Sequence, residues 1–342
     1  MESMIIEMKT SASEKEIQAV LNKIKALGFE VQLNNGKEHI VIAVLGSDTG
    51  DVDTQVFEAF SGVEQVLRIQ KPFKLASLDF KKERTKIQIG DVEIGGKEIA
   101  IMAGPCSVES EEQLISCAKI AKANGAQFLR GGAFKPRSSP FAFQGLEEEG
   151  LKILAKARDA TGLLIVTEVV SPEEVNLVAG YADVLQIGAR NMQNYRLLEA
   201  VGKAKRPVLL KRGLSSTIEE WLMAADYILR GNGDPNVILC HRGIRTFDNS
   251  TRFTYDVGSI PVLRRLTHLP IITDPSHAAG KFYLVPDFAK MAIAGGTDGL
   301  IMEIHPDPQN AVSDGAQSLT FSDFSRTMKE LKTLAAAVGR KI

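Results

Sequence analysis

Residues 100–130 read AIMAGPCSVESEEQLISCAKIAKANGAQFLR, which is an apolar run, a helical pattern and a second apolar run. The apolar runs at Ala100–Ala103 and Gln127–Arg130 are short and bounded by polar or glycine residues, as is typical of buried strands. Between them, Ser110 with Gln113 forms a capping box that begins an amphipathic helix. The stretch therefore predicts one strand, helix, strand unit of a parallel sheet.

The same unit repeats along the rest of the chain. Six further apolar runs follow at Leu163–Thr167, Val184–Ile187, Val208–Lys211, Val237–Cys240, Ile271–Thr273 and Gly299–Glu303. Helical patterns begin near Glu147, Ser171, Asn194, Thr217, Ser259, Pro286 and Ser322. Eight strands, each followed by a helix, predict a (β/α)8 TIM barrel better than an open doubly wound sheet, and no Gly-x-Gly-x-x-Gly follows the first strand.

The first 70 residues have a different pattern, which is strand, helix, strand, strand, helix, strand. A capping box of Ser13 and Glu16 begins its first helix. This order predicts a small ferredoxin-like α+β domain over residues 1–70. Residues 71–84 are rich in Lys without periodicity and are predicted to be a linker. Residues 85–342 are predicted to form the barrel, opened by a hairpin at Ile87–Ile94.

The composition is that of an ordinary soluble protein of 342 residues with a formal net charge of −1. This balance argues against a general nucleic-acid or membrane partner and favours small anions as ligands. No run of eighteen apolar residues appears, the first residues are too polar for a signal peptide, and three scattered cysteines do not form a disulfide framework. We therefore expect a cytoplasmic protein.

Reactive residues follow the strands of the predicted barrel. They are Cys106, Arg130, Lys135, Arg137, Ser138, Glu168, Arg190, Lys211, Arg242, His277, Glu303 and Asp314. A single cation at a strand end is usually solvated or held in a weak surface ion pair. Six cations at one barrel mouth need counter-ions, because a buried unpaired charge costs several kcal/mol. The cluster therefore predicts polyanionic ligands that together carry two phosphates, with or without a carboxylate.

Four of these residues also suit a metal ion. Cys106, His277, Glu303 and Asp314 offer sulfur, nitrogen and oxygen donors, a mixture that excludes Mg²⁺ and Ca²⁺ and favours a divalent first-row ion such as Mn, Fe, Zn or Co. Spacing alone leaves an alternative open, in which Cys106 is a small core residue and His277 a hydrogen-bonded loop histidine. Their shared place at strand ends favours the metal.

These residues stand in motifs that resemble one family, the 3-deoxy-D-arabino-heptulosonate 7-phosphate (DAHP) synthases of the short form with an N-terminal ferredoxin-like regulatory domain. The resemblance covers nearly the whole chain. The motifs are Ala103–Ser110, Arg130–Ser139, Gln186–Asn191, Leu210–Gly213, Asp274–His277, Glu303–Pro308 and Ser313–Gly315. One departure is His241, where related enzymes usually have Glu in Cys-Glu-Arg-Gly.

The resemblance implies roles for individual residues. Metal ligands would be Cys106, His277, Glu303 and Asp314. Phosphoenolpyruvate would be held by Arg130, Lys135, Ala189, Arg190, Lys211 and Arg242, with Glu168 nearby. Erythrose 4-phosphate would be held by Pro136, Arg137 and Ser138. Lys135 is our candidate proton donor, and Glu168 or His277 would position water.

The resemblance further implies an enzyme of the shikimate pathway, feedback control by an aromatic amino acid (Tyr or Phe) at the N-terminal domain, and a dimer or tetramer. Two alternatives remain. A 3-deoxy-octulosonate 8-phosphate synthase using arabinose 5-phosphate shares the barrel but has Lys-Ala-Asn-Arg in the loop where this chain has Lys135-Pro136-Arg137. A catalytically silent sensor of a phosphosugar or an amino acid is the second.

Overall fold

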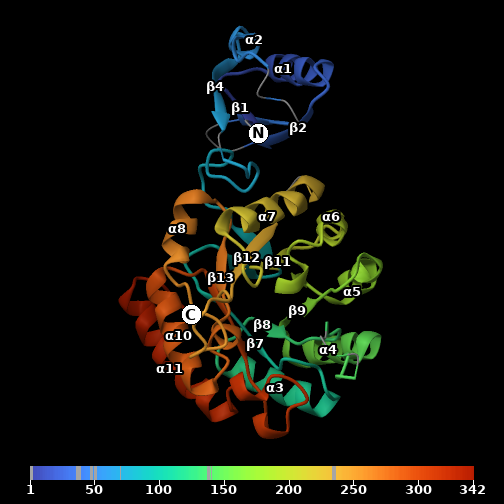
Figure 1. Cartoon of the computed structure of the whole chain (residues 1–342), viewed down its shortest axis with the longest axis vertical. Helices are drawn as coiled ribbons and strands as arrows, with labels where there is room; N and C mark the ends of the chain where they lie inside the picture. Colours follow the sequence, from blue (N-terminus) through green and yellow to red (C-terminus); the bar gives the residue numbers. More distant parts are fainter. Residues whose placement is uncertain are drawn as a thin grey trace.

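The structure, a computed structural model, describes residues 3–35, 40–46, 49, 52–69, 71–136, 139, 141–232 and 236–342. A small N-terminal body and a large barrel follow each other along the chain, and the small body lies outside the ring of barrel helices, on the side where α7 and α8 are found (Figure 1). Among the described residues, no helix has the length and apolar character needed to cross a membrane.

The N-terminal body is a four-stranded antiparallel sheet with two helices. Its elements are β1 (Ser3–Met8), α1 (Glu14–Ala26), β2 (Glu30–Asn35), β3 (Ile40–Leu45), α2 (Gln55–Glu58) and β4 (Val63–Ile69). The strand order β2-β3-β1-β4 is that of a ferredoxin-like fold, as predicted. The capping box of Ser13 and Glu16 is present. Val20 and Ile24 of α1 pack on Ile6 and Ile42 of the sheet to form its core.

Eight parallel strands close into a barrel, which confirms the predicted fold. They are β7 (Ala100–Gly104), β8 (Phe128–Arg130), β9 (Leu164–Glu168), β10 (Val184–Ile187), β11 (Val208–Lys211), β12 (Val237–His241), β13 (Ile271–Thr273) and β14 (Gly299–Glu303). Before them, β5 (Ile87–Ile89) and β6 (Val92–Ile94) form the predicted hairpin. Its Ile87 and Ile94 share a core cluster with the barrel interior residues Met102 and Phe128.

Helices surround the barrel (Figure 1). They are α3 (Glu111–Ala123), α4 (Glu147–Thr161), α5 (Val175–Tyr181), α6 (Tyr195–Lys203), α7 (Ile218–Asn232), α8 (Ser259–Leu266), α9 (Pro275–Ala279), α10 (Val285–Gly295) and α11 (Phe321–Ala337). The predicted starts agree within a residue except at Ser171, whose capping box begins a 3-10 turn that precedes α5. Helix α9 was not predicted, because five residues are too few to show a period.

Residues 71–84, predicted as a linker, pack firmly on the barrel. Leu75 and Phe80 are buried in the same core cluster as the barrel helices. The half-buried carboxylate of Asp226 on α7 accepts hydrogen bonds from the backbone N–H groups of Lys74, at 2.5 Å, and Ala76, at 2.8 Å. The connection between the two bodies is therefore anchored to α7.

Candidate active site

The C-terminal ends of the barrel strands surround a cavity of about 330 Å³. The predicted residues that line it are Lys135, Pro136, Glu168, Ala189, Arg190, Lys211, Arg242, His277 and Asp314. Arg130, Cys106 and Glu303 belong to the same rim and are buried. The remaining two predicted residues, Arg137 and Ser138, lie outside the described part of the chain. The structure thus brings together residues from strand ends spread over two hundred positions.

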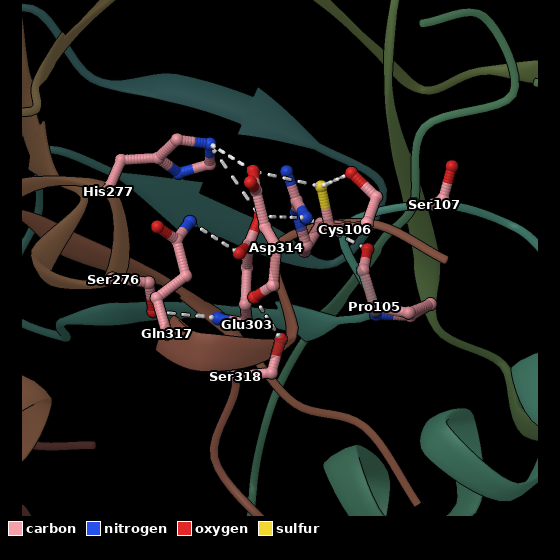
Figure 2. A network of polar contacts seen from close by, with 12 residues as sticks. Pro105, Cys106, Ser107, Ser276, His277, Glu303, Asp314, Gln317 and Ser318 are labelled. Atoms are coloured by element: carbon pink, nitrogen blue, oxygen red, sulfur yellow. Dashed lines mark hydrogen bonds and ion pairs between the residues drawn. The ribbon is translucent and has the colours of Figure 1, made fainter. Parts of the chain in front are cut away.

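Three of the four predicted metal ligands form a compact cluster. One ligand atom each of Cys106, Glu303 and Asp314 lies within 4.8 Å of the others. The Nε2 atom of His277 is 3.7 Å from Glu303 Oε1 and 3.8 Å from Asp314 Oδ2 (Figure 2). A thiol, an imidazole and two carboxylates that converge at these distances match the donors that first-row divalent ions take in proteins.

The protonation of Cys106 bears on whether these residues fit a metal. Burial raises the pKa of the Cys106 thiol to about 11, and the neighbouring charge of Glu303 adds to this effect. The Sγ atom lies 3.4 Å from Asp314 Oδ2 and 3.0 Å from Lys135 Nζ. Without a cation between them, the thiol stays protonated beside two carboxylates. A divalent ion would replace that proton and balance both carboxylates, so the donor set fits such an ion.

Asp274 orients His277. The Asp274 carboxylate caps α9, where Oδ1 accepts from the His277 backbone N–H at 2.9 Å. Its Oδ2 lies 2.8 Å from His277 Nδ1 and accepts from Lys211 Nζ at 2.6 Å. Burial opposes ionisation of Asp274, but His277 and Lys211 outweigh it and hold the Asp274 pKa well below its usual range. Because Nδ1 lies against this carboxylate, Nε2 is the ring nitrogen that faces the cluster, as in many metal-binding histidines.

Two rim cations already have protein partners, which corrects the expectation that only ligands supply their counter-charge. Arg130 Nη1 donates to Glu303 Oε1 at 2.8 Å, and Lys211 pairs with Asp274. Neither carboxylate is near its partner in the sequence, because each carboxylate lies at the end of a different strand from the cation that it pairs with. These pairs offset the cost of burying the cations, and they leave further N–H donors for a ligand.

Arg242 differs from these two cations. It is 4 % exposed, and its Nη1 atom has no hydrogen-bond partner among the described residues. Its guanidinium lies 3.8 Å from the ring centroid of Phe253. Burial lowers the pKa of Arg242 to about 10, with the nearby cations Arg252 and Arg190 acting in the same direction. A buried donor crowded by cations indicates a place for an anion.

Lys135 reaches back over the loop to the metal cluster. Its Nζ donates to the carbonyl oxygen of Cys106 at 3.0 Å, besides its contact with the thiol. Gly132 permits this approach, because a Cβ there would lie 2.8 Å from Lys135 Cδ and 2.9 Å from the Cys106 carbonyl oxygen. At the end of β9, the strand next to β8 in the barrel, Glu168 Oε2 accepts from Gln186 Nε2 at 3.1 Å. Lys135 therefore lies between the cluster and the cavity.

Sequence reasoning missed four polar residues of this site. Arg245 and Arg252 line the cavity, Asp274 orients His277, and Gln317 contacts Glu303. Asp274 had a readable signal, since it precedes Pro275 as a helix N-cap does. The others stand in irregular loops, where no periodicity marks them.

His241, the departure from the family pattern, is fully buried on the outer face of β12. Its ring centroid lies 5.4 Å from that of Tyr255. Burial lowers the pKa of His241 to about 4, and the cation Arg212 adds to the shift. The imidazole is therefore neutral in the folded protein at neutral pH.

This burial predicts acid sensitivity. Between pH 6.5 and 4 the unfolded chain binds a proton at His241 that the folded chain does not, so the free energy of unfolding falls as the pH falls, by about 1.4 kcal/mol per unit. We expect His241→Met to lessen this slope in urea titrations at pH 7, 5.5 and 4.5. His268, which burial shifts in the same direction, remains in both proteins. An unchanged slope would contradict the prediction.

The protein is a closed (β/α)8 barrel, and its strand ends form a cation-lined cavity beside a cluster of a thiol, an imidazole and two carboxylates. These features define its class, which is a barrel enzyme. Comparison with known proteins specifies the family. The family model described as "DAHP synthetase I family" matches residues 76–338, and that described as "DAHP synthase ferredoxin-like domain" matches residues 4–71. The chain belongs to the DAHP synthase family.

Among similar proteins, a relative that matches the full chain agrees with this assignment, and a more distant one has the octulosonate activity. The phospho-2-dehydro-3-deoxyheptonate aldolase of Thermotoga maritima is 45% identical over 339 residues, which cover 99% of this chain and 100% of that protein. Its solved structure, described as a DAHP synthase, aligns with a TM-score of 0.79 over 100% of this chain and 99% of that one. The 2-dehydro-3-deoxyphosphooctonate aldolase of Geobacter sulfurreducens is 30% identical and covers 74% of this chain and 98% of its own.

Proposed function

We propose that this chain condenses phosphoenolpyruvate with erythrose 4-phosphate, with the aid of a divalent metal, to give DAHP and inorganic phosphate. This is the first step of the shikimate pathway to aromatic amino acids. The observation that carries the proposal is Arg242, a buried guanidinium without a partner for Nη1 among the described residues, which faces a cavity lined by further cations. A multiply charged phosphate ester would supply what this site lacks.

The two substrates would divide the cavity. Arg190, Lys211 and Arg242, with Ala189 in the turn after β10, would hold phosphoenolpyruvate, together with Arg130 and Lys135 from the β8 side. Pro136 also lines the cavity, where its carbonyl oxygen accepts from Arg190 Nη1 at 2.8 Å. Arg137 and Ser138, which follow it in the sequence, are the predicted contacts of the erythrose 4-phosphate phosphate. Holding two mutually repelling anions at reacting distance is a large part of what such an enzyme must do.

Cys106, His277, Glu303 and Asp314 would hold Mn, Fe, Zn or Co. When bound, the ion supplies a Lewis acid for the aldehyde oxygen. In the reaction, a carbon–carbon bond forms between the phosphoenolpyruvate methylene and the aldehyde carbon, water adds at the enol carbon, and C–O cleavage releases phosphate. Lys135, within reach of both cavity and cluster, would give a proton to the new alkoxide. Glu168, which also lines the cavity, would position the water.

A substrate assay tests this function. Phosphate release from phosphoenolpyruvate by metal-loaded protein should require erythrose 4-phosphate. The octulosonate reaction is the enzyme alternative, given the relatives at 30% identity, and equal or better turnover with arabinose 5-phosphate would establish it. Binding of both substrates without turnover, measured by titration calorimetry, would establish the silent sensor instead.

The N-terminal body would act as a sensor of Tyr or Phe in a homo-oligomer, a dimer or a tetramer, in the cytoplasm. Deleting residues 1–70 should leave an active enzyme that neither amino acid inhibits. A truncated form of the Thermotoga maritima enzyme, 46% identical and covering 79% of this chain with a TM-score of 0.73, has a solved structure. The measurement is initial rate against effector concentration for both lengths. A full-length enzyme that neither amino acid inhibits would contradict the sensor role.

A further inference from the structure

Two polar residues outside the ligand set connect its carboxylates. Gln317, which is 2 % exposed, belongs to a 3-10 turn at Gly315–Gln317. Its Nε2 donates to Glu303 Oε2 at 2.6 Å (Figure 2), and its Oε1 accepts from Arg252 Nη1 at 2.5 Å. A carboxylate can only accept and a guanidinium can only donate, so the amide between them has one workable orientation.

Arg252 also contacts the second carboxylate directly. Its Nη1 lies 3.3 Å from Asp314 Oδ1, while Oδ2 of the same carboxylate faces Cys106 and His277. Asp314 has a φ of 51°, in the left-handed region that few residues other than Gly adopt. One guanidinium therefore holds Asp314 through an ion pair and Glu303 through Gln317.

The backbone of Arg252 is fixed to the helix that carries His277. Its N–H donates to Ala279 O at 3.2 Å, and the next N–H, of Phe253, donates to Ala278 O at 3.0 Å. Gly280, which ends α9 with a φ of 68°, allows this approach, because a Cβ there would overlap the Cβ of Arg252. The Arg252 segment thus connects to three of the four metal-ligand candidates, His277, Glu303 and Asp314.

We propose that Arg252 and Gln317 form a clamp, which orients the Glu303 and Asp314 carboxylates for a divalent cation before that cation binds. The proposal rests on the metal site put forward under Proposed function. Without the guanidinium, the Gln317 amide is free to turn its oxygen toward Glu303, where two acceptors repel. Metal ligands that are already ordered lose less entropy when the cation binds, so the loss of the clamp should lower the affinity for the cation. Arg252 is in this sense a positioning residue.

The test uses the full-length, metal-free chain and Co²⁺ alone, with no substrate present. Affinity is measured by competition with a chelating dye, and the thiolate-to-Co²⁺ absorption band reports the sulfur ligand. We expect Arg252→Met and Gln317→Met each to weaken Co²⁺ binding by roughly 10- to 100-fold. Arg252→Lys keeps the positive charge but loses the forked guanidinium, so its Co²⁺ affinity should lie between those of the parent and Arg252→Met. Arg326→Met, which removes an exposed partner of Asp323 on α11, should bind as the parent does.

The outcomes separate the clamp from the metal site. Co²⁺ affinities within threefold of the parent in both Met variants overturn the clamp, even if turnover falls, since Arg252 then serves the substrate alone. A parent that shows no thiolate band sensitive to Cys106→Ala overturns the metal site and the clamp with it. Thermal melting of the metal-free variants reports folding, and if Arg252→Met does not fold, the affinities of Arg252→Lys and Gln317→Met decide.

Discussion

Replacing Cys106 with alanine should lower metal-dependent turnover by at least about 100-fold, more than the loss of a residue that only hydrogen-bonds to a metal ligand. The thiol is the only soft donor in the cluster of described residues and lies within 4.8 Å of the Glu303 and Asp314 ligand atoms. Its removal leaves oxygen and nitrogen donors, which hold Zn²⁺ or Co²⁺ less selectively. The measurement is the initial rate after chelation and add-back of each candidate ion.

Cys117→Ala is the matched control for this prediction. Cys117 is also a buried thiol, but it packs in the core on α3 among residues such as Leu114 and Ala118. Its loss should affect stability without changing turnover per folded molecule or the ion required. If Cys106→Ala regained the parent rate after metal add-back, the metal assignment would be wrong. Cys106 would then be a small core residue, the alternative that its sequence spacing left open.

The barrel was predictable because its strands are buried on both faces, so each one is a short apolar run bounded by turn residues. Once the strand ends were located, barrel geometry placed Lys211 and Arg242 on one rim although thirty residues separate them. Pairing across the rim was not predictable in the same way. The partner of Arg130 is Glu303, which stands 173 positions away in the sequence, and nothing local to either residue marks the pair.

Residues in irregular segments account for most of what sequence reasoning missed. Arg252 lies in an irregular loop and Gln317 in a 3-10 turn of three residues, both too irregular or too short to show a period, and their partners are distant in the sequence. The cations that line the cavity show what a count of charges can predict and what it cannot. A charge count predicts that counter-ions are needed, but only the fold decides whether a carboxylate of the chain or an anionic ligand supplies them. Here Asp274 supplies the counter-charge of Lys211, whereas Arg242 Nη1 has no hydrogen-bond partner among the described residues.

Asp274→Asn should damage both stability and activity, because Asp274 serves two partners at once. The carboxylate is 1 % exposed and contacts Lys211 Nζ and His277 Nδ1 through one oxygen. Its neutral replacement leaves the Lys211 ammonium buried without its counter-charge, at a cost of about 3–5 kcal/mol in unfolding free energy. It also removes the group that orients the His277 ring. We expect kcat/KM for phosphoenolpyruvate to fall by about 100-fold or more.

The loss of stability in Asp274→Asn should be smaller when phosphoenolpyruvate is present. If phosphoenolpyruvate binds the folded chain as proposed and brings negative charge to Lys211, it should bind Asp274→Asn more tightly than the parent. At one phosphoenolpyruvate concentration used for both proteins, it should therefore raise the unfolding midpoint of Asp274→Asn by more than that of the parent. Urea titrations with and without phosphoenolpyruvate measure this difference. Asp287→Asn, at an exposed position on α10 paired with Lys290, is the control and should match the parent. An Asp274→Asn protein with parental stability would mean that Lys211 does not depend on that carboxylate, and that the cavity cations share their counter-charge more widely than the two ion pairs imply.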